Sequence, residues 1–466
     1  MKNSICRYDV SMRKLLETIN QEPAGIAFVV DGSGCLCGVV TDGDFRRMLL
    51  AGRSLDEQLQ PGDLRDFVFA KQGQTVDELL RITNKKVRII PIVDEDGKPI
   101  DYFRYEHRVN IMPVAEPDLK GNEFKYLSDA FLSTWISSRG KYIDEFEAGF
   151  SKYCGVKYGI ATANGTVAIH LALLALGIGP GDEVIVPDLT FAATINTVLH
   201  SGATPVIVDI DPVSWCIDPR EIKKAITSRT RAIIPVHLYG QPCDMDSIMD
   251  IAREKKLFVI EDCAEAHGAR YKGKAVGSFG DISCFSFFGN KIITTGEGGI
   301  CLTSSAELDE RMRVLRDHGM SKNKRYWHDL VGYNYRMTNL QAAIGVAQLE
   351  RIDSIIRERK QVESGYRNIL DDLGLITWQK DFNGNERVVW LVSILVQEKR
   401  EQLFEALRDS GVDYRPFFYP LSEMEIYKPY VFSAEVSAKI SAAGLNLPTI
   451  SGVDFEKVGK AFKSIA

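Results

Sequence analysis

The pattern of apolar and polar residues divides the chain into three parts. In the first, residues 1–108, an apolar strand, a turn with Asp and Gly, and a second short strand occur twice. The copies lie at 27–40 and 89–103, and a helical pattern precedes each of them, at 12–20 and 75–83. Asp31 and Gly34 of the first turn recur in the second as Asp94 and Gly97. Such an internal repeat predicts two copies of one small α/β unit.

The second part, residues 109–350, alternates short apolar runs with helical stretches. The runs are rich in Val and Ile, which is typical of strands buried on both faces, and they lie at 183–187, 204–210, 231–236 and 257–262. Helical patterns lie between them, at 167–176, 219–227 and 245–256. This alternation predicts a largely parallel sheet with helices on both faces. Residues 106–121, which carry two prolines, are interpreted as a linker.

The third part, residues 351–466, begins with a long polar helical pattern at 351–370. A strand-like run at 388–396 and a helical pattern at 401–411 follow it. A smaller C-terminal α+β domain is therefore predicted.

Composition and charge narrow the classes of protein that the chain could represent. Its 466 residues are 45% hydrophobic and 26% charged, which is typical of a globular protein. The net charge of -6 and the lack of a basic run give no sign of a nucleic-acid partner. No apolar run is long enough to predict a membrane span, and the N-terminus lacks the apolar run of a secretory signal.

Nine cysteines are scattered along the chain without the spacing of a disulfide framework. Cys35 and Cys37 are close in sequence, but no second Cys or His pair completes a zinc site. We therefore expect reduced thiols in a cytoplasmic protein and no bound metal.

Three separated features are consistent with one cofactor. The first is Gly165 with Thr166, where a strand gives way to a helix. A helix N-terminus offers free N–H groups and a positive dipole end to a phosphate, and Thr166 adds a hydroxyl donor. The alternative is that Asn164, Gly165 and Thr166 only cap the helix, and for this segment alone the alternative is favoured.

The second and third features are an acid and a lysine. Asp262 ends an apolar strand, where open α/β sheets present ligands, and a carboxylate there can pair with a protonated pyridine nitrogen. Lys291 follows a strand-like run and precedes a Gly-rich hairpin. Beside a phosphate and a ring cation its pKa would fall, which favours Schiff-base formation. The alternatives are a helix-capping Asp and a surface Lys. The order of phosphate cradle, acid and lysine is more specific than any one of the three.

Residues 110–466 resemble the DegT/DnrJ/EryC1/StrS family of sugar-nucleotide aminotransferases, which belong to the fold-type-I class of pyridoxal-phosphate (PLP) enzymes. The resemblance rests on long strings: STWISSRGKYIDEFE (133–147), GPGDEVIVPDLTFAAT (179–194), PVHLYGQPCDMD (235–246), EDCAEAHGA (261–269), SFFGNKIITTGEGG (286–299), RYWHDLVGYNYRMTNLQAAIG (325–345) and LNLPT (445–449). It implies PLP as cofactor, a PLP-binding large domain at 109–350 and a small C-terminal domain at 351–466.

The resemblance assigns roles to matching positions around the cofactor ring. Lys291 would hold PLP as a Schiff base and also move the proton during the reaction. Asp262 would bind the pyridinium nitrogen, and Glu265 would approach the ring hydroxyl. For Glu265, an exposed helix residue is an equal alternative.

Other matching positions would surround the phosphate and the face of the ring. The phosphate would be bound by Ser286 together with Gly165 and Thr166. Phe191 would stack on the ring, unless it is a core aromatic. Asn334 would reach the cofactor phosphate of the other subunit, which implies a homodimer or higher homo-oligomer, unless it is a turn residue.

Substrate contacts are less well marked. Tyr326, Trp327 and His328 are candidates for the sugar pocket, and a packed loop is an equal alternative. One position departs from the family: many relatives have a His in the C-terminal RPxFxP segment where RPFFYPLSEMEIY (415–427) has Ser422. If that His contacts substrate, the sugar or nucleotide preference of this chain has changed.

Residues 1–108 resemble a pair of cystathionine-β-synthase-type (CBS) modules. GVVTDGDFRRML (38–49) matches their pattern, in which the Thr and the Asp, here Thr41 and Asp44, contact the phosphate and ribose of a bound nucleotide. The second copy, GKPIDYFRY (97–105), lacks this spacing. The resemblance therefore implies one regulatory nucleotide site, and a docking or dimerisation module without ligand is the alternative.

The expected activity is transfer of an amino group, with glutamate as donor, to a GDP- or UDP-linked 4-keto-6-deoxyhexose. A second hypothesis is a PLP-dependent sugar 3-dehydratase, but those relatives have His where this chain has Lys291. A third is a nucleotide-sensing protein with a vestigial catalytic domain, against which the intact set Asp262, Ser286 and Lys291 argues.

Overall fold

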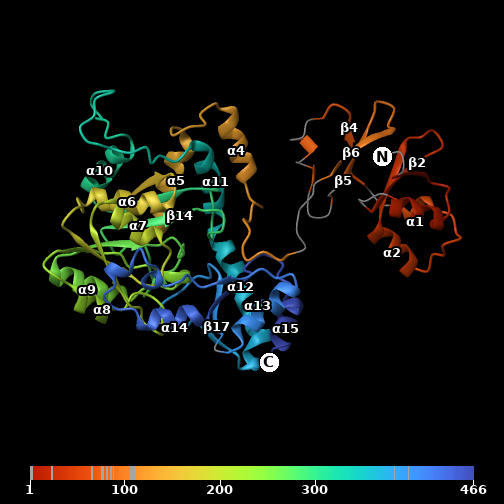
Figure 1. Cartoon of the computed structure of the whole chain (residues 1–466). Coiled ribbons are helices and arrows are strands. Elements are labelled where there is room, and N and C mark those ends of the chain that lie inside the picture. The colour runs from red at the N-terminus through yellow and green to blue at the C-terminus, as the bar shows by residue number, and fades with distance from the viewer. Residues whose placement is uncertain are drawn as a thin grey trace. The chain divides into compact units, whose positions relative to one another are not determined.

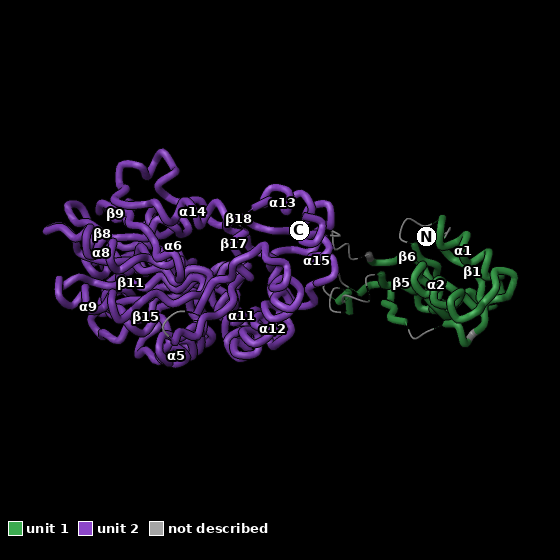
Figure 2. The backbone as a smooth tube through the Cα atoms, turned by 90° about the horizontal axis from the view of Figure 1, so that it is seen from below, with its two compact units in different colours: residues 1–109 green, residues 110–466 purple. Residues whose placement is uncertain are grey.

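The chain folds into two units, residues 1–109 and 110–466 (Figure 2). Each unit has its own hydrophobic core. The computed structural model describes residues 4–21, 25–64, 67–74, 78–79, 82–83, 87, 89–104, 111–381, 384–396 and 398–465. The predicted domain boundary at 108/109, most of the predicted helix at 75–83 and the first part of the predicted linker lie outside these described residues.

The N-terminal unit repeats one strand order. It contains β1 (Ile5–Arg7), α1 (Met12–Gln21), β2 (Ile26–Val30), β3 (Leu36–Thr41), α2 (Asp42–Leu50), the 3₁₀ turn η2 (Pro61–Asp63), β4 (Ala70–Lys71), β5 (Ile89–Val93) and β6 (Pro99–Arg104). In the first sheet β1 is parallel to β2, and β2 forms an antiparallel hairpin with β3. In the second sheet β4, β5 and β6 are paired in the same way, as the internal repeat predicts.

The recurring Asp and Gly residues make the two hairpin turns alike. Oδ1 of Asp31 accepts hydrogen bonds from two backbone N–H groups of its turn, and Oδ1 of Asp94 does the same. Gly34 and Gly97 have φ angles of 84° and 82°, in the left-handed region that favours glycine. The two turns also touch, because the N–H of Leu36 donates to the carbonyl of Gly97 at 2.9 Å.

The second unit contains a seven-stranded sheet of order β7-β15-β14-β11-β10-β8-β9, in which β15 alone runs antiparallel to its neighbours. The strands are β7 (Tyr158–Thr162), β8 (Glu183–Pro187), β9 (Thr204–Val208), β10 (Thr230–Ile233), β11 (Phe258–Asp262), β14 (Ile282–Ser286) and β15 (Gly299–Thr303). Six strands therefore have their carboxyl ends at one edge of the sheet, where parallel sheets present ligands.

Helices cover both faces of this sheet, as the alternating pattern predicts (Figure 1). One core joins the sheet to α6 (Gly165–Ala175), α7 (Ala193–His200) and α10 (Ala306–Arg316). The other core joins it to α5 (Lys141–Cys154), α8 (Pro219–Ala225), α9 (Met245–Lys255) and α11 (Asn339–Glu350). Neighbouring residues of one strand face opposite cores, as Val184 and Ile185 of β8 do.

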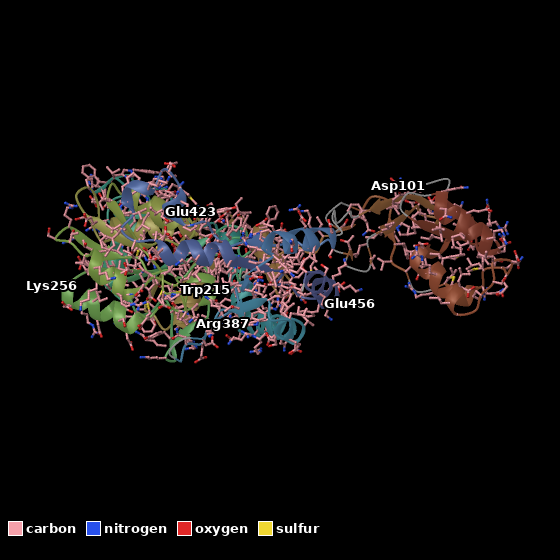
Figure 3. All side chains as sticks on the ribbon, turned by 60° about the horizontal axis from the view of Figure 1, so that its bottom comes forward. Asp101, Trp215, Lys256, Arg387, Glu423 and Glu456 are labelled. Carbon is pink, nitrogen blue, oxygen red and sulfur yellow. The ribbon has the colours of Figure 1, made fainter. Side chains whose placement is uncertain are left out.

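Helix α4 (Glu123–Leu132) packs on α11, and three short elements, η3 (Leu238–Gly240), β12 (Arg270–Tyr271) and β13 (Lys274–Ala275), lie in loops of this part of the chain. The buried Trp215 lies inside the unit, whereas Lys256 and Glu456 extend from its surface (Figure 3). None of the helices in the described part of the chain could span a membrane.

The C-terminal part is α+β, with an antiparallel sheet of order β16-β17-β19-β18. Its elements are α12 (Ile352–Leu370), η4 (Asp371–Leu373), β16 (Ile376–Trp378), β17 (Val392–Val396), α13 (Arg400–Asp409), β18 (Arg415–Pro416), η5 (Leu421–Glu423), η6 (Lys428–Tyr430), α14 (Glu435–Ala443), β19 (Gly444–Leu447) and α15 (Phe455–Lys463). Its core lies between this sheet and α12, α13 and α15. The strand predicted at 388–396 is shorter than expected, because 388–391 is buried but irregular.

Candidate active site

The residues singled out for a cofactor gather at the carboxyl edge of the large sheet. Asp262 is the last residue of β11, Ser286 is the last residue of β14, and Gly165 opens α6 just after β7. Phe191 follows β8 in the loop that leads to α7. Lys291 lies in the loop of the hairpin formed by β14 and β15. The parallel strands thus bring together residues that are far apart in sequence.

The start of α6 packs tightly against the end of β14. A Cβ atom at Gly165 would lie 2.7 Å from Cβ and 3.1 Å from Oγ of Ser286, so only glycine fits this approach without a shift. The side chain of Asn164 accepts a hydrogen bond from the N–H of Val167 at 3.0 Å, which confirms the predicted cap. Capping does not exclude phosphate binding, because several N–H groups of the first turn have no partner within the helix.

Asp262 is a buried carboxylate with no ion-pair partner within 4 Å among the described residues. Its Oδ2 accepts from the hydroxyl of Thr194 at 2.9 Å, and its Oδ1 accepts from the N–H of Ala264 at 3.1 Å. Burial raises the pKa of Asp262, although these two hydrogen bonds oppose the shift. A cationic ring nitrogen would supply the missing charge partner and favour the ionised carboxylate.

Lys291 and Glu265 form a buried pair. The side chain of Lys291 is 12% exposed, and its Nζ lies 3.6 Å from Oε1 of Glu265. Burial lowers the pKa of Lys291, while the charges of Glu265 and Asp262 oppose the shift. Burial raises the pKa of Glu265 to about 7 against the attraction of Lys291. The two alternatives named above, an exposed Glu265 and a surface Lys291, are therefore wrong.

Phe191 and Asn334 are exposed. Phe191 is 60% exposed and so is not a core aromatic, and a ring stacked on it would cover apolar surface. The segment of Asn334 runs beside the end of β7, since the N–H of Ala163 donates to the carbonyl of Tyr335 at 2.8 Å. Oδ1 of Asn334 accepts from Nε of Arg336 within the same chain.

Tyr326, Trp327 and His328 lie in an exposed loop between α10 and α11. Nζ of Lys324 lies 3.9 Å from the ring of Trp327, and Nδ1 of His328 lies 2.8 Å from the carbonyl of His318. Among the described residues, no hydrogen bond or ring contact joins these three side chains to the group around Lys291. The structure therefore neither packs this loop into the core nor brings it to the lysine.

Ser422, the position that departs from the family, is bound to a buried acid. Its N–H donates to Oδ1 of Asp188 at 2.7 Å and its hydroxyl donates to Oδ2 at 2.8 Å. Ser437 also donates to this carboxylate. Asp188 stands just after β8, three residues before Phe191, so this network ties the loop of Phe191 to the C-terminal segment. Sequence reasoning missed Asp188.

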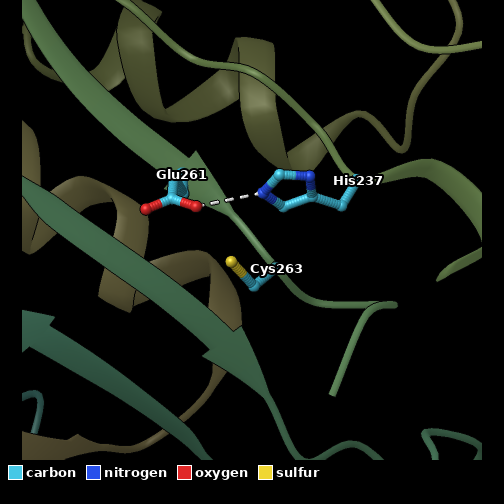
Figure 4. A group of neighbouring side chains, drawn as sticks. All are labelled: His237, Glu261 and Cys263. Atoms are coloured by element: carbon cyan, nitrogen blue, oxygen red, sulfur yellow. Dashed lines mark hydrogen bonds and ion pairs between the residues drawn. The ribbon is translucent and has the colours of Figure 1, made fainter. Parts of the chain in front are cut away.

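A second buried group near the site has a structural role. His237, Glu261 and Cys263 are close enough to share a metal ion (Figure 4). However, Nδ1 of His237 accepts from the N–H of Cys243, and its Nε2 lies 3.2 Å from Glu261. Glu261 also accepts from three backbone N–H groups in the loop at 277–280. Burial acts to raise the pKa of Glu261, but these bonds hold it below its usual value. These hydrogen bonds tie the segment at 237–243 and the loop at 277–280 to the end of β11.

The geometry fits PLP at this edge of the sheet. It combines a helix N-terminus with an adjacent serine, a buried acid that lacks a cation, a buried lysine of lowered pKa and an exposed aromatic face. Together with the fold, this set defines a PLP-dependent aminotransferase.

Comparison with known proteins agrees with this class. The family model "DegT/DnrJ/EryC1/StrS aminotransferase family" matches residues 117–466, and the CBS domain model matches residues 3–51 and 62–107. The chain therefore belongs to the DegT/DnrJ/EryC1/StrS aminotransferase family and carries a CBS pair at its N-terminus. The predicted fold class, enzyme class and cofactor are confirmed.

Individual relatives extend the likeness over nearly their whole length. The GDP-perosamine synthase of Caulobacter vibrioides is 50% identical over 364 residues, which are 76% of this chain and 97% of the relative. That of Escherichia coli O157:H7 is 46% identical, with 74% and 95% covered. Among solved structures, DesV of S. venezuelae is 33% identical with a TM-score of 0.69, covering 74% of this chain and 93% of DesV. The PLP-form of Spr1654 from Streptococcus pneumoniae is 27% identical with a TM-score of 0.71, covering 76% and 100%.

In the N-terminal unit, Thr41 and Asp44 bind each other at the start of α2. Thr41 is the N-cap of α2, and its hydroxyl lies 2.6 Å from Oδ2 of Asp44, which also accepts from the N–H of Thr41. Arg47 donates to Oδ1 of Asp44. Burial acts to raise the pKa of Asp44, but these bonds hold it below its usual value. The pair thus forms a capping box, a role that sequence reasoning did not foresee.

Proposed function

We propose that this enzyme transfers an amino group from glutamate to the 4-keto carbon of a GDP-linked 4-keto-6-deoxyhexose. The observation that carries the proposal is 50% identity to a GDP-perosamine synthase of which the chain covers 97%. Three such synthases are 46–50% identical to this chain. A UDP-linked keto sugar is the alternative substrate. Ser422 stands where many relatives have His, and this difference in a possible substrate contact is the reason to test both nucleotides.

In this proposal each residue of the site has one task. PLP supplies the carbonyl group that receives the amine and the ring that withdraws electrons. Lys291 holds the cofactor and, as a free amine, moves a proton. Asp262 keeps the pyridine nitrogen protonated by its negative charge, and Glu265 lies beside the ring hydroxyl.

Other residues in the proposal hold the cofactor in place. Gly165, Thr166 and Ser286 bind its phosphate, and Phe191 covers the face of its ring. Asn334 reaches the phosphate bound by the other subunit, so that the working enzyme is a homodimer or higher homo-oligomer. Tyr326, Trp327 and His328 are the candidates for the sugar pocket, although no hydrogen bond or ring contact among the described residues joins their loop to Lys291.

Product analysis tests the activity. The purified chain, loaded with PLP, is incubated with isotopically labelled glutamate and either a GDP-linked or a UDP-linked 4-keto-6-deoxyhexose. We expect labelled nitrogen in a GDP-linked amino sugar, detected by mass spectrometry. Faster conversion of the UDP-linked sugar would transfer the proposal to that nucleotide, and no labelled product from either would refute it.

Replacement of Lys291 separates transamination from binding. Lys291→Ala should abolish turnover and leave the fold intact, because no other described side chain of the site offers an amine. Turnover near the wild-type rate in Lys291→Ala would refute the role of this lysine. The presence of lysine rather than histidine at position 291 argues against the alternative of a 3-dehydratase.

The N-terminal CBS pair is proposed to bind one regulatory nucleotide in its first copy, at Thr41 and Asp44. The capping box at these residues supports a preformed helix N-terminus, which suits a phosphate. A docking module without ligand remains the alternative. We accordingly divide the chain into three domains: the CBS pair at 1–108, the PLP-binding large domain at 109–350 and the small C-terminal domain at 351–466.

A further inference from the structure

A buried tryptophan contacts the cofactor lysine from the C-terminal part of the chain. Nζ of Lys291 lies 3.9 Å from the ring centroid of Trp390, which is 3% exposed. Among the described residues, Glu265 is the one ion-pair partner of this amine, with Oε1 at 3.6 Å. The charges of Asp262 and Arg415 also act on it, Asp262 favouring and Arg415 opposing the protonated form. Trp390 belongs to the irregular stretch before β17.

Hydrogen bonds fix the tryptophan at both ends. Its Nε1–H donates to the carbonyl of Asn290, the residue before Lys291, at 2.8 Å. Its own carbonyl accepts from Nη1 of Arg359 at 2.6 Å. The guanidinium of Arg359 is itself buried in α12. Trp390 therefore holds the backbone next to the lysine as well as facing the amine.

Two further aromatic rings pack against Trp390 and restrict its movement. The ring centroid of Tyr239 lies 6.0 Å from that of Trp390 with an angle of 17° between the ring planes, and for Phe418 the values are 6.4 Å and 25°. The N–H of Tyr239 donates to Oε2 of Glu265, and its hydroxyl accepts from the N–H of Phe418. Tyr239 has a φ of 53°, which costs backbone energy and persists only where the surroundings impose it. The partners of the amine, Glu265 and Trp390, are thus joined through Tyr239.

We propose that Trp390 is a positioning residue for Lys291, with its ring face holding the protonated amine and its N–H anchoring the adjacent backbone. The inference rests on the role of Lys291 in the proposed function. A ring face attracts a cation and has little attraction for a neutral amine, so it acts on one protonation state only. The ring therefore opposes the effect of burial on the lysine and keeps both protonation states accessible to a proton carrier.

Titration of Lys291 in the cofactor-free full chain tests this directly. The rate of acetylation of Lys291 by acetic anhydride is measured against pH by mass spectrometry of its peptide. In Trp390→Met, which fills the space without a ring, the apparent pKa of Lys291 should fall by roughly 0.5–1 unit. Trp390→Phe keeps a ring face, so the pKa of Lys291 in this variant should stay close to the wild-type value. Trp378→Met is the matched control, because Trp378 faces the guanidinium of Arg367 in the C-terminal part.

Fluorinated tryptophans give a second measurement that leaves the shape of the side chain unchanged. Each added fluorine weakens the attraction of the ring for a cation, so the pKa of Lys291 should fall stepwise in wild type and stay constant in the Trp390→Phe background. An unchanged pKa in Trp390→Met, an equal shift in the Met and Phe variants, or no dependence on fluorination would overturn the proposal. Because no sugar nucleotide is used, failure of the proposed activity leaves this test unaffected.

Discussion

At the scale of single residues, the site consists of ionisable groups that burial has shifted towards their neutral forms. Asp262 and Glu265 have raised pKa values, and Lys291 has a lowered one. Perturbed titratable groups that converge at a sheet edge are typical of functional sites. Replacing Asp262 or Glu265 should therefore change a measurable property of the protein: the rate of transamination or the pH dependence of its stability.

Replacement of Asp262 tests the charge partner of the cofactor ring. Asp262→Ala should lower the rate of transamination by about 100-fold or more, because loss of one preorganised electrostatic contact has that effect. Single-turnover kinetics with glutamate measures it, and Asp246→Ala, at an exposed acid, is the control. A decrease under threefold with cofactor still bound would contradict the role of Asp262.

Glu265 should make the stability of the cofactor-free protein depend on pH. Its pKa rises from 4.5 to about 7 on folding, so between these values the folded protein retains a proton that the unfolded chain has lost. Stability therefore falls as pH rises through this window. Glu265→Gln cannot ionise and so avoids this loss. The difference in free energy of unfolding between the variant and wild type should therefore grow in favour of the variant as pH rises, to about 1–3 kcal/mol.

Thermal unfolding of the two proteins across this pH range measures that advantage. Glu254→Gln, on the exposed side of α9, should show no such trend. An advantage for Glu265→Gln that is constant with pH would show that Glu265 is ionised in the folded protein.

At the scale of elements, the site depends on how closely a helix start approaches a strand end. The first residue of α6 packs on the last residue of β14, and Asp188 joins the end of β8 to η5 and α14 through Ser422 and Ser437. Because these contacts join segments distant in sequence, a small displacement of one element moves cofactor-binding groups on another.

Replacement of Gly165 tests the cradle. Gly165→Ala would place a Cβ atom 2.7 Å from Ser286, and overpacking of this kind typically costs about 1–3 kcal/mol. We expect PLP affinity to fall by about tenfold or more, measured by absorbance titration of the cofactor-free protein. Gly179→Ala, where the nearest atom is at 3.5 Å, should bind PLP as wild type does. Equal affinities for both variants would place the phosphate elsewhere.

At the scale of the whole molecule, the chain combines an aminotransferase unit with a second, N-terminal unit. The match to the Caulobacter relative covers 97% of that protein but 76% of this chain. The additional N-terminal residues form a unit with its own cores, which the CBS model matches. A ligand of that unit alters catalysis only if it binds two states of the enzyme with different affinity.

Calorimetric titration of adenine and guanine nucleotides and of the amino-sugar nucleotide product should reveal one site per chain. Asp44→Asn, which keeps an acceptor for the cap but loses the charge, should bind the ligand more weakly. If the site regulates, ligand should change apparent substrate affinity by about 1–3 kcal/mol in the full chain and not in a chain that starts at residue 111. If no nucleotide binds and the full and shortened chains have equal kinetics, the N-terminal unit is a docking module without a ligand.

Much of the fold and part of the candidate site could be predicted from local patterns in the sequence. The pattern of apolar residues predicted four strands of the large sheet, β8 to β11, and the helices α6, α8 and α9. Capping chemistry predicted the start of α6 at Asn164. The position of Asp262 at the end of an apolar run predicted that it lies at the edge of the sheet where ligands bind. The repeated Asp and Gly residues likewise predicted two similar turns in the N-terminal unit.

What the sequence by itself determined, then, is the order of elements, the class of fold and the chemical groups at the ends of the strands. Burial periodicity and helix capping depend on near neighbours in the chain, so they can be recognised in a single sequence. Only the tertiary structure decided that Trp390 faces Lys291, that Asp188 binds Ser422 and that Glu265 is buried. Such contacts join distant segments and depend on close packing, which has no periodic signature.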